Sequence, residues 1–262
     1  IKGDIRSVKN CQKAFKNKVD FVLHQAALGS VPRSFIDPLS THDVNVNGFL
    51  NIYRSAALNK VSRFVFASSS SVYGDIKDSP KREDRLGNVS SPYALSKLIN
   101  EMYIFQYYKI YKLNYVGLRY FNIFGKRQNP RGAYAAVIPK WIDAMKNNKK
   151  IQIYGDGKTT RDFCYISNAV EANLLSAICS NNSLNQIYNI GTGKKTSLNE
   201  LFKLIKLILS ENLDREYFKN PYFNDFRKGD IRQSLADISK AKKLLNYNPA
   251  YDLLEGLKKT IV

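Results

Sequence analysis

The 262-residue chain lacks several features that would place it in a special class of protein. No run approaches the roughly 20 apolar residues of a membrane-spanning helix, and we expect no signal peptide. Cysteines are scarce: Cys11, Cys164 and Cys179 are odd in number and widely spaced. We therefore expect a reducing compartment, the cytoplasm, with no disulfide framework and no metal site.

Acidic residues are also scarce, because 22 Asp and Glu stand against 41 Lys and Arg, for a formal net charge of +19. Such a balance raises the question of nucleic-acid binding. The lysines are scattered through helical stretches, however, and no recognised nucleic-acid-binding module accompanies them. We therefore attribute the charge to a solvated surface that would attract an anionic small molecule, and we expect neither a nucleic acid nor a membrane as partner.

The first half of the chain alternates short apolar runs with helical stretches. Residues 19–24, 63–67 and 115–119 have the composition of buried strands, whereas 44–59 and 93–112 have that of helices. This alternation predicts an α/β fold with a doubly wound parallel sheet.

The character of the chain changes after Asn122. A turn-rich segment at 129–132 is followed by expected helices at 135–149, 198–209 and 238–245 and a short strand at 151–154. We expect a sheet domain over 1–130 and a smaller α/β substrate-binding lobe, interleaved with the sheet domain, over 131–262.

Tyr93 and Lys97 lie four residues apart at an expected helix start, so they share one face of that helix. A neighbouring ammonium favours the phenolate, so we expect Lys97 to lower the pKa of Tyr93 and to allow acid–base chemistry near neutral pH. Such a pair is common on helix surfaces by itself. Four serines, Ser68–Ser71, follow the strand at 63–67, at the strand end where open α/β sheets carry out chemistry. A serine-rich turn is the alternative reading, but the combination favours a catalytic site.

In this order and spacing, these motifs resemble the extended short-chain dehydrogenase/reductase superfamily. Within it, the chain resembles the NAD-dependent epimerase/dehydratase family, closest to the UDP-N-acetylglucosamine 4-epimerases. The resemblance runs almost end to end and also rests on His24-Gln25-Ala26-Ala27, Asn45-Val46-Asn47-Gly48, Leu118-Arg119-Tyr120-Phe121-Asn122, Tyr154-Gly155-Asp156-Gly157, Arg161-Asp162-Phe163 and Tyr188-Asn189-Ile190-Gly191.

The resemblance implies a doubly wound (Rossmann) sheet, NAD as a retained cofactor, and reversible 4-epimerisation of a UDP-sugar through a 4-keto intermediate. Tyr93 would be the general base, Ser69 the catalytic serine, and Lys97 the contact to the nicotinamide ribose. His24 is expected to be structural. Implied cofactor contacts are Asp4, Ile5, Gln25, Ala26, Ala27, Asn45, Tyr93, Lys97 and Tyr120.

The resemblance also implies where the UDP-sugar binds. Arg161 and Arg227 would clamp the diphosphate, since a guanidinium matches phosphate oxygens, and Tyr154 would stack on uracil. Asp230 would contact the ribose. The full set of implied substrate contacts is Gly29, Ser30, Ser69, Ser70, Tyr93, Asn122, Gln128, Val137, Tyr154, Arg161, Arg227, Asp230 and Ser234.

Two positions narrow the implied reaction. Related dehydratases and decarboxylases carry acidic residues where this chain has Ser70 and Ser71, which favours simple epimerisation. Related enzymes restricted to non-acetylated hexoses carry a tyrosine at the position of Ser234, and a serine leaves room for a 2-acetamido group. We expect conversion of UDP-N-acetylglucosamine to UDP-N-acetylgalactosamine for surface polysaccharide synthesis. The alternatives are UDP-N-acetylglucosaminuronate, UDP-glucose, or a non-catalytic nucleotide-sugar-binding relative.

One motif of such sheets does not occur here. A glycine-rich turn after the first strand brings backbone N–H groups to a pyrophosphate, and no G-x-x-G-x-x-G precedes the strand at 19–24. The resemblance implies that roughly 60–70 residues, with that strand and turn, are missing upstream. It also implies a homodimer formed through helices at about 44–58 and 93–112.

Overall fold

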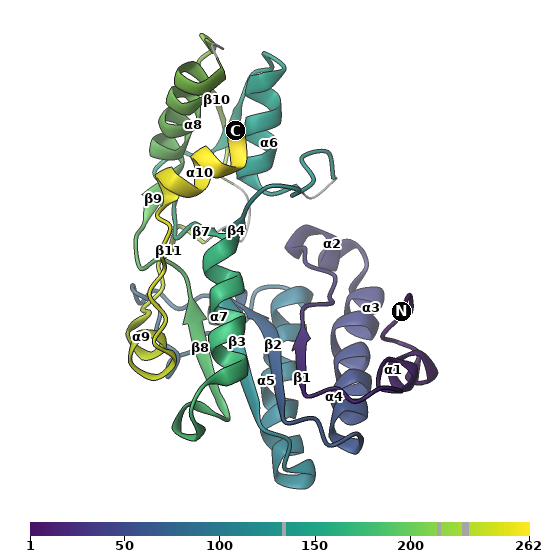
Figure 1. Ribbon diagram of the computed structural model, residues 1–262. Coiled ribbons are helices and arrows are strands. Elements are labelled where there is room, and N and C mark those ends of the chain that lie inside the picture. The colour runs from purple at the N-terminus through teal and green to yellow at the C-terminus, as the bar shows by residue number, and fades with distance from the viewer. Residues whose placement is uncertain (133–134, 214–215, 227–230) are drawn as a thin grey trace.

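The computed structural model describes residues 1–132, 135–213, 216–226 and 231–262. Its centre is a four-stranded, fully parallel sheet in the order β1 (Phe21–His24), β2 (Arg63–Ser69), β3 (Tyr115–Tyr120) and β8 (Gln186–Ile190) (Figure 1). Each connection between neighbouring parallel strands contains helix, as βαβ units require. The predicted doubly wound α/β fold is confirmed.

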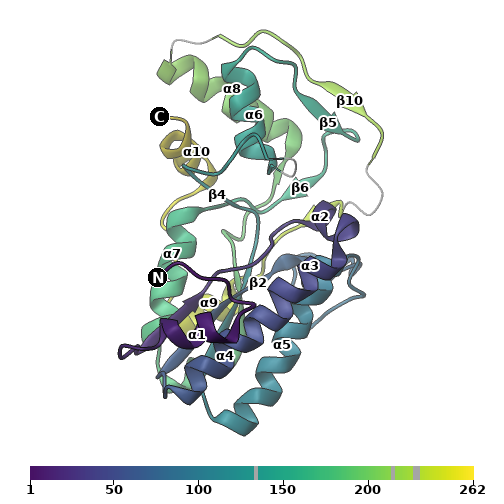
Figure 2. The same ribbon diagram turned by 90° about the vertical axis from the view of Figure 1, so that its right-hand side faces the viewer.

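Helices cover both faces of this sheet (Figure 2). On one face, α4 (Gly48–Leu58) and α5 (Pro92–Tyr111) enclose a core that includes Phe49, Tyr53 and Phe64. On the other face, α7 (Ile166–Ile178) and α9 (Ser239–Leu245) pack over Val65, Leu118 and Tyr188. Because side chains alternate along a strand, β2 contributes to both cores, and the sheet is buried as expected for parallel strands.

The strand β2 is longer than expected, since it runs through Ser69 and not only to residue 67. Its last two residues pair with the end of β3, Ser68 opposite Arg119 and Ser69 opposite Tyr120. Backbone pairing with β3 therefore holds half of the serine cluster in the sheet. Ser70–Tyr73 form a 3₁₀ turn directly after it.

Above the sheet lies a second lobe, built around α6 (Val137–Lys146), α8 (Leu198–Leu213) and α10 (Leu253–Ile261) (Figure 1). Its core contains Trp141, Ile153 and Leu201. The chain enters this lobe after β4 (Ile123–Phe124), returns to the sheet domain for α7 and β8, and then enters the lobe again. The two parts are thus interleaved along the chain.

Short strands outside the main sheet complete the fold. The parallel pairs are β4 with β7 (Cys164–Tyr165) and β5 (Gln152–Tyr154) with β10 (Tyr222–Asn224). A three-stranded sheet has the order β11 (Gln233–Ser234), β6 (Thr160–Arg161) and β9 (Thr196–Ser197). Further helices in the described residues are α1 (Val8–Ala14), α2 (Val31–Ile36), α3 (Pro38–His42), a π-helical turn at Asp43–Asn47 and a 3₁₀ turn at Asn181–Ser183. None of the described helices is both long and apolar enough to span a membrane.

Candidate functional site

The start of α5 carries Tyr93 and Lys97 over the carboxyl end of β2. The Ser91 hydroxyl accepts a hydrogen bond from the Ala94 amide (3.1 Å), and Pro92 occupies the first turn, so the helix begins where the sequence predicts. Four residues separate Tyr93 from Lys97, which places both on one face of α5. The capped first turn therefore fixes the position of both side chains.

Ser69 lies beside Tyr93 with its hydroxyl oriented by Ser71. The Ser69 oxygen accepts hydrogen bonds from the Ser71 amide (3.1 Å) and the Ser71 hydroxyl (2.9 Å). Its own proton is then available to a neighbouring acceptor, and the Ser69 side chain acts to lower the pKa of Tyr93. Ser71 is thus a residue that orients Ser69, whereas Ser70 follows in the 3₁₀ turn with a half-buried side chain.

The expected lowering of the Tyr93 pKa by Lys97 is wrong. Burial raises the pKa of Tyr93 above its ordinary value, and the hydrogen bond from Ser69 opposes that rise without cancelling it. The Lys97 ammonium donates to the carbonyl of Ala67 (2.8 Å). Spacing on the helix correctly placed the pair on one face, but burial in the site dominates the electrostatics.

Lys97 is almost fully enclosed, with 4% of its surface exposed, and burial lowers its pKa to about 8. Among the described residues, the Lys97 ammonium donates a hydrogen bond to the Ala67 carbonyl and to no other group. An ammonium has three N–H donors, so two remain for a ligand.

We expect this burial to appear as a pH dependence of stability. Between about pH 8 and 10.5 the unfolded chain holds a proton that the folded Lys97 has lost, so the free energy of unfolding rises with pH across this window. The Lys97 contribution is on the order of 3 kcal/mol. Chemical denaturation of the protein and of Lys97→Met at pH 7.5 and 10 measures the difference. Equal pH slopes for the two chains would contradict the assignment.

His24 and Asn45 are both held in place by contacts within the protein. His24 is buried between Phe49 and Phe64 (ring centroids at 5.6 and 5.8 Å), and burial, followed by the charge of Lys97, lowers its pKa to about 3. The Asn45 amide accepts from the Leu28 amide (2.7 Å) and donates to the Leu28 carbonyl (3.2 Å) and the Ser96 hydroxyl (3.0 Å). Asn45 therefore ties the loop after β1 to α5.

The residues Gln25, Ala26 and Ala27 form that loop, at the same edge of the sheet as Tyr120 at the end of β3. Asn173 of α7, which sequence analysis did not single out, joins the two predicted contacts. It accepts from the Gln25 side chain (2.9 Å) and donates to the Tyr120 hydroxyl (2.6 Å). Burial raises the pKa of Tyr120 to about 12, so its phenol is neutral.

Asp4 and Ile5 lie at the start of the chain, beside α1 and α4. The Asp4 carboxylate is paired with Arg6 (2.6 Å), and hydrogen bonds from Arg6 lower the pKa of Asp4 to about 2. The Ile5 carbonyl accepts a hydrogen bond from the Asn51 side chain (3.1 Å). This short segment is thus fixed against α4.

A cavity of about 410 Å³ lies in the second lobe and contains four of the predicted substrate contacts, Asn122, Val137, Tyr154 and Arg161. Sequence analysis missed other residues that line it: Lys140, Trp141, Lys150, Phe163 and Tyr222. Among the described lining residues the charged side chains are all cationic, and four are aromatic. Such a cavity matches an anion joined to a flat ring, because cations attract phosphate and aromatic faces stack on bases.

Arg161 and Ser234 face each other across the β6–β11 pair. The Arg161 guanidinium donates to the carbonyls of Thr160 (2.9 Å) and Ile231 (2.6 Å). The next residue, Asp162, is fully buried and accepts hydrogen bonds from Thr192 (2.8 Å) and the amides of Gly193 and Ala236 (3.0 and 3.3 Å). This carboxylate therefore fixes the segments that carry Arg161 and Ser234 against the end of β8.

The other predicted substrate contacts are dispersed around the junction. Gly29 is exposed, with open space at its Cα, and Ser30 caps the start of α2 by accepting from the Arg33 amide (3.2 Å). The Gln128 amide nitrogen donates to the Ile123 carbonyl (3.4 Å), whereas its oxygen is buried without a partner in the described chain. Arg227 and Asp230 lie outside the described residues.

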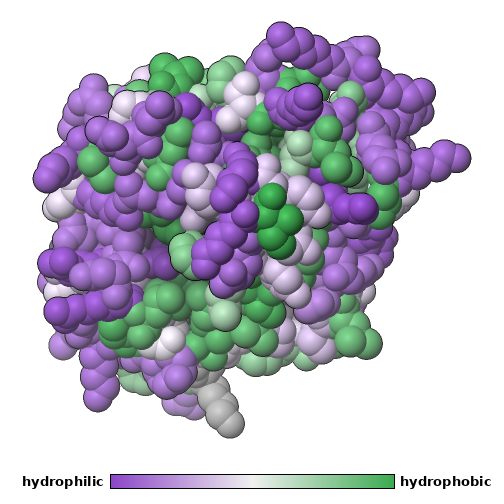
Figure 3. Space-filling model, turned by 90° about the horizontal axis from the view of Figure 1, so that it is seen from below, coloured by the Kyte–Doolittle hydropathy of each residue, from purple (hydrophilic) through white to green (hydrophobic). Residues whose placement is uncertain are grey.

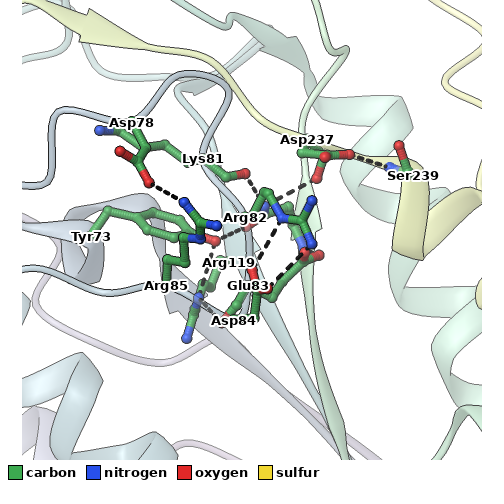
Figure 4. A network of polar contacts seen from close by, with 11 residues as sticks. Tyr73, Asp78, Lys81, Arg82, Glu83, Asp84, Arg85, Arg119, Asp237 and Ser239 are labelled. Atoms are coloured by element: carbon green, nitrogen blue, oxygen red, sulfur yellow. Dashed lines mark hydrogen bonds and ion pairs between the residues drawn. The ribbon is translucent and has the colours of Figure 1, made fainter.

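A second cavity, of about 630 Å³, contains no predicted site residue. Its lining includes Arg82, Glu83, Asp84, Arg119, Ile187, Asp237, Ser239 and Lys240, most of which are drawn in Figure 4. The Glu83 carboxylate accepts from the Asn189 amide (2.8 Å), and Lys240 donates to the Ile187 carbonyl (2.9 Å). These two side chains satisfy backbone groups at the outer edge of β8, which is a structural task. We therefore place the candidate active site at Tyr93 and the lobe cavity.

Comparison with known proteins gives concordant matches. A family model described as "NAD dependent epimerase/dehydratase family" matches residues 1–191. A putative UDP-glucose 4-epimerase of Methanocaldococcus jannaschii is 39% identical over 262 residues, which cover 100% of this chain and 82% of that protein. The crystal structure of a Thermotoga maritima UDP-glucose 4-epimerase with UDP-glucose has a TM-score of 0.93 at 34% identity, covering 100% of this chain and 82% of that one. A UDP-N-acetylglucosamine 4-epimerase of Methanobrevibacter ruminantium in complex with UDP-N-acetylmuramic acid has a TM-score of 0.90 at 38% identity, covering 100% and 81%.

Proposed function

Because the chain belongs to the NAD-dependent epimerase/dehydratase family, we propose that it is an NAD-dependent UDP-sugar 4-epimerase whose substrate is a UDP-N-acetylhexosamine. The observation that carries the proposal is that Ser69, Tyr93 and the buried Lys97 ammonium, which donates to Ala67, lie together at the carboxyl end of the parallel sheet. Chemistry in open α/β sheets takes place at that edge.

The site fits the nicotinamide end of the cofactor. The two remaining N–H donors of Lys97 suit ribose hydroxyls, and the neutral phenol of Tyr120, held by Asn173, offers a second polar group. Ala26 and Ala27 carry small side chains, so a ligand can approach the loop after β1 closely. Asp4 and Ile5 are proposed contacts further from the reacting centre.

In the proposed reaction, Tyr93 takes the proton from the sugar 4-hydroxyl while Ser69 holds the same oxygen by a hydrogen bond. Bound NAD would accept a hydride from C4 and return it, and its cationic nicotinamide ring would favour the phenolate form of Tyr93. Tyr93 returns the proton when the opposite face of the 4-keto sugar has been reduced. Configuration at C4 is thereby inverted without change of composition.

The lobe cavity is the proposed nucleotide site. Arg161, Lys140 and Lys150 supply positive charge for the diphosphate, and Tyr154 is the proposed stacking partner of uracil. Arg227 and Asp230 remain proposed contacts to the diphosphate and the ribose. The absence of a carboxylate among the described lining residues supports an anionic ligand.

Two observations support the N-acetylated sugar. Ser234 is 9% exposed and lies opposite Arg161 in the β6–β11 strand pair. Its short side chain is therefore next to the proposed diphosphate contact, where we propose that the sugar binds. The partnerless, buried oxygen of Gln128 is an acceptor that the N–H of an acetamido group would satisfy. Gly29, Ser30, Ser70, Asn122 and Val137 complete the proposed substrate contacts.

The proposal is tested by incubating the protein with NAD and UDP-N-acetylglucosamine and separating the nucleotide sugars by chromatography. We expect UDP-N-acetylgalactosamine to accumulate until the two epimers reach a constant ratio. An unchanged substrate, or a dehydrated product, would contradict the proposed reaction.

We also propose a homodimer through α5, whose outer face is apolar. Met102, Phe105 and Ile110 are 63%, 52% and 67% exposed. Seen from below, apolar residues gather on the side of the molecule where this helix lies, among charged surroundings (Figure 3). Light scattering should give twice the chain mass for the protein and the single chain mass for Phe105→Glu. A monomer at micromolar concentration would reject the dimer.

A further inference from the structure

One stripe of α5 lies against the last three residues of β2. Tyr93 lies beside Ser69, and Lys97 donates to the Ala67 carbonyl (2.8 Å). Glu101, one further turn along α5, accepts from the Ser68 hydroxyl (2.5 Å). Lys97 and Glu101, four apart on α5, thus bind the neighbouring strand residues Ala67 and Ser68, and the second contact is formed by a carboxylate to which the proposed reaction assigns no role.

The Glu101 carboxylate is buried and paired by a bidentate contact. The Arg119 guanidinium donates to both Glu101 oxygens (3.0 and 2.7 Å), and both side chains are less than a tenth exposed. Arg119 also donates to the Tyr73 hydroxyl (3.0 Å), and that hydroxyl donates to the Asn189 side chain (2.6 Å). Figure 4 shows Arg119 and Tyr73 side by side within this network. Bidentate pairs of this kind hold one geometry.

We propose that Glu101, acting through Ser68, is the positioning residue that sets the register of α5 against β2 and thereby the approach of Tyr93 to Ser69. This inference rests on the proposed epimerase function. Ser68 is covalently next to Ser69, and Glu101 is on the same rigid helix as Tyr93. A displacement at the Ser68–Glu101 contact is therefore passed directly to both reacting hydroxyls, and errors of about 1 Å in such geometry cost on the order of a hundredfold in rate.

The substitution Ser68→Ala tests this role, because it removes the helix–strand contact and leaves the Arg119–Glu101 pair intact. With UDP-N-acetylglucosamine and NAD, we expect kcat to fall at least about tenfold while KM changes less than about threefold. Ser176→Ala is the matched control, since Ser176 is a fully buried serine whose hydroxyl donates to Ala172 (2.6 Å) within α7. The control should retain kcat, although it too loses a buried hydrogen bond.

The same substitution made in a Ser69→Ala protein distinguishes a positioning role of Ser68 from a purely structural one. If Ser68 acts through Ser69, then Ser68→Ala should have almost no further effect on kcat in a Ser69→Ala protein. Independent, multiplicative losses would overturn the inference, as would a Ser68→Ala protein that melts earlier but turns over normally. If Ser69→Ala itself leaves kcat unchanged, the proposed function of Ser69 fails, and this outcome is distinct from a failure of the positioning role.

Discussion

Tyr93→Phe should lower kcat by about 10²- to 10⁴-fold, the contribution that a positioned general acid–base group makes. The phenylalanine ring fills the same space, but no group remains to take the proton from the sugar 4-hydroxyl. Tyr93 lies beside Ser69 and is not among the residues that line the lobe cavity with Arg161 and Tyr154. Binding of the UDP-sugar, measured by calorimetry, should therefore change only several-fold.

Tyr103→Phe is the control for this prediction. Tyr103 is on the same helix, 40% exposed, and packs edge-on against Tyr107 (5.6 Å between ring centroids). Its hydroxyl is remote from Ser69, so turnover should be normal. A Tyr93→Phe protein with near-normal kcat would show that another group carries the proton.

Ser234→Tyr should lower kcat/KM for UDP-N-acetylglucosamine roughly 100-fold or more while retaining turnover of UDP-glucose. The reason is steric: Ser234 is buried beside Arg161, and a phenol ring there would occupy the space proposed for the acetamido group. A pocket that is too small by one methylene group lowers kcat/KM for the larger substrate by about 10- to 200-fold relative to the smaller one, and an acetamido group is larger than a methylene group. Parallel assays with the two substrates give the ratio directly.

Gln233→Tyr is the matched control, because Gln233 precedes Ser234 in β11 and is exposed on the opposite side of the strand. It introduces the same ring outside the space proposed for the acetamido group, so the preference between the two sugars should not change. Loss of both activities in Ser234→Tyr would indicate a folding defect. Retention of both would refute the assignment of Ser234 to the sugar site.

The fold could be predicted from sequence because its signals are local. Apolar runs such as Phe64–Ala67 and the helix start near Tyr93 are determined by neighbouring residues, and the structure has a strand and a helix start at these places. The cluster of Asn122, Val137, Tyr154 and Arg161 was accessible only through the family resemblance, since these positions come from separate elements that meet at one cavity.

What sequence analysis missed depends on contacts between residues distant in the chain. Asn173 matters because it joins Gln25 and Tyr120, from the ends of two different strands. Glu101 matters because it meets Ser68, 33 residues away. The pKa of Tyr93 was misjudged for the same reason: helix spacing gives the position of Lys97, but burial by the surrounding fold decides the direction of the shift.

The most direct test of the account uses UDP-N-acetylglucosamine that carries deuterium at C4, with NAD and ordinary water. If Tyr93 moves the hydroxyl proton while C4 hydrogen is removed and returned within one site, the product UDP-N-acetylgalactosamine must retain deuterium at C4. Mass spectrometry and proton NMR of the isolated product measure this retention. Loss of the deuterium to solvent, or failure of the C4 configuration to change, would contradict the proposed epimerisation.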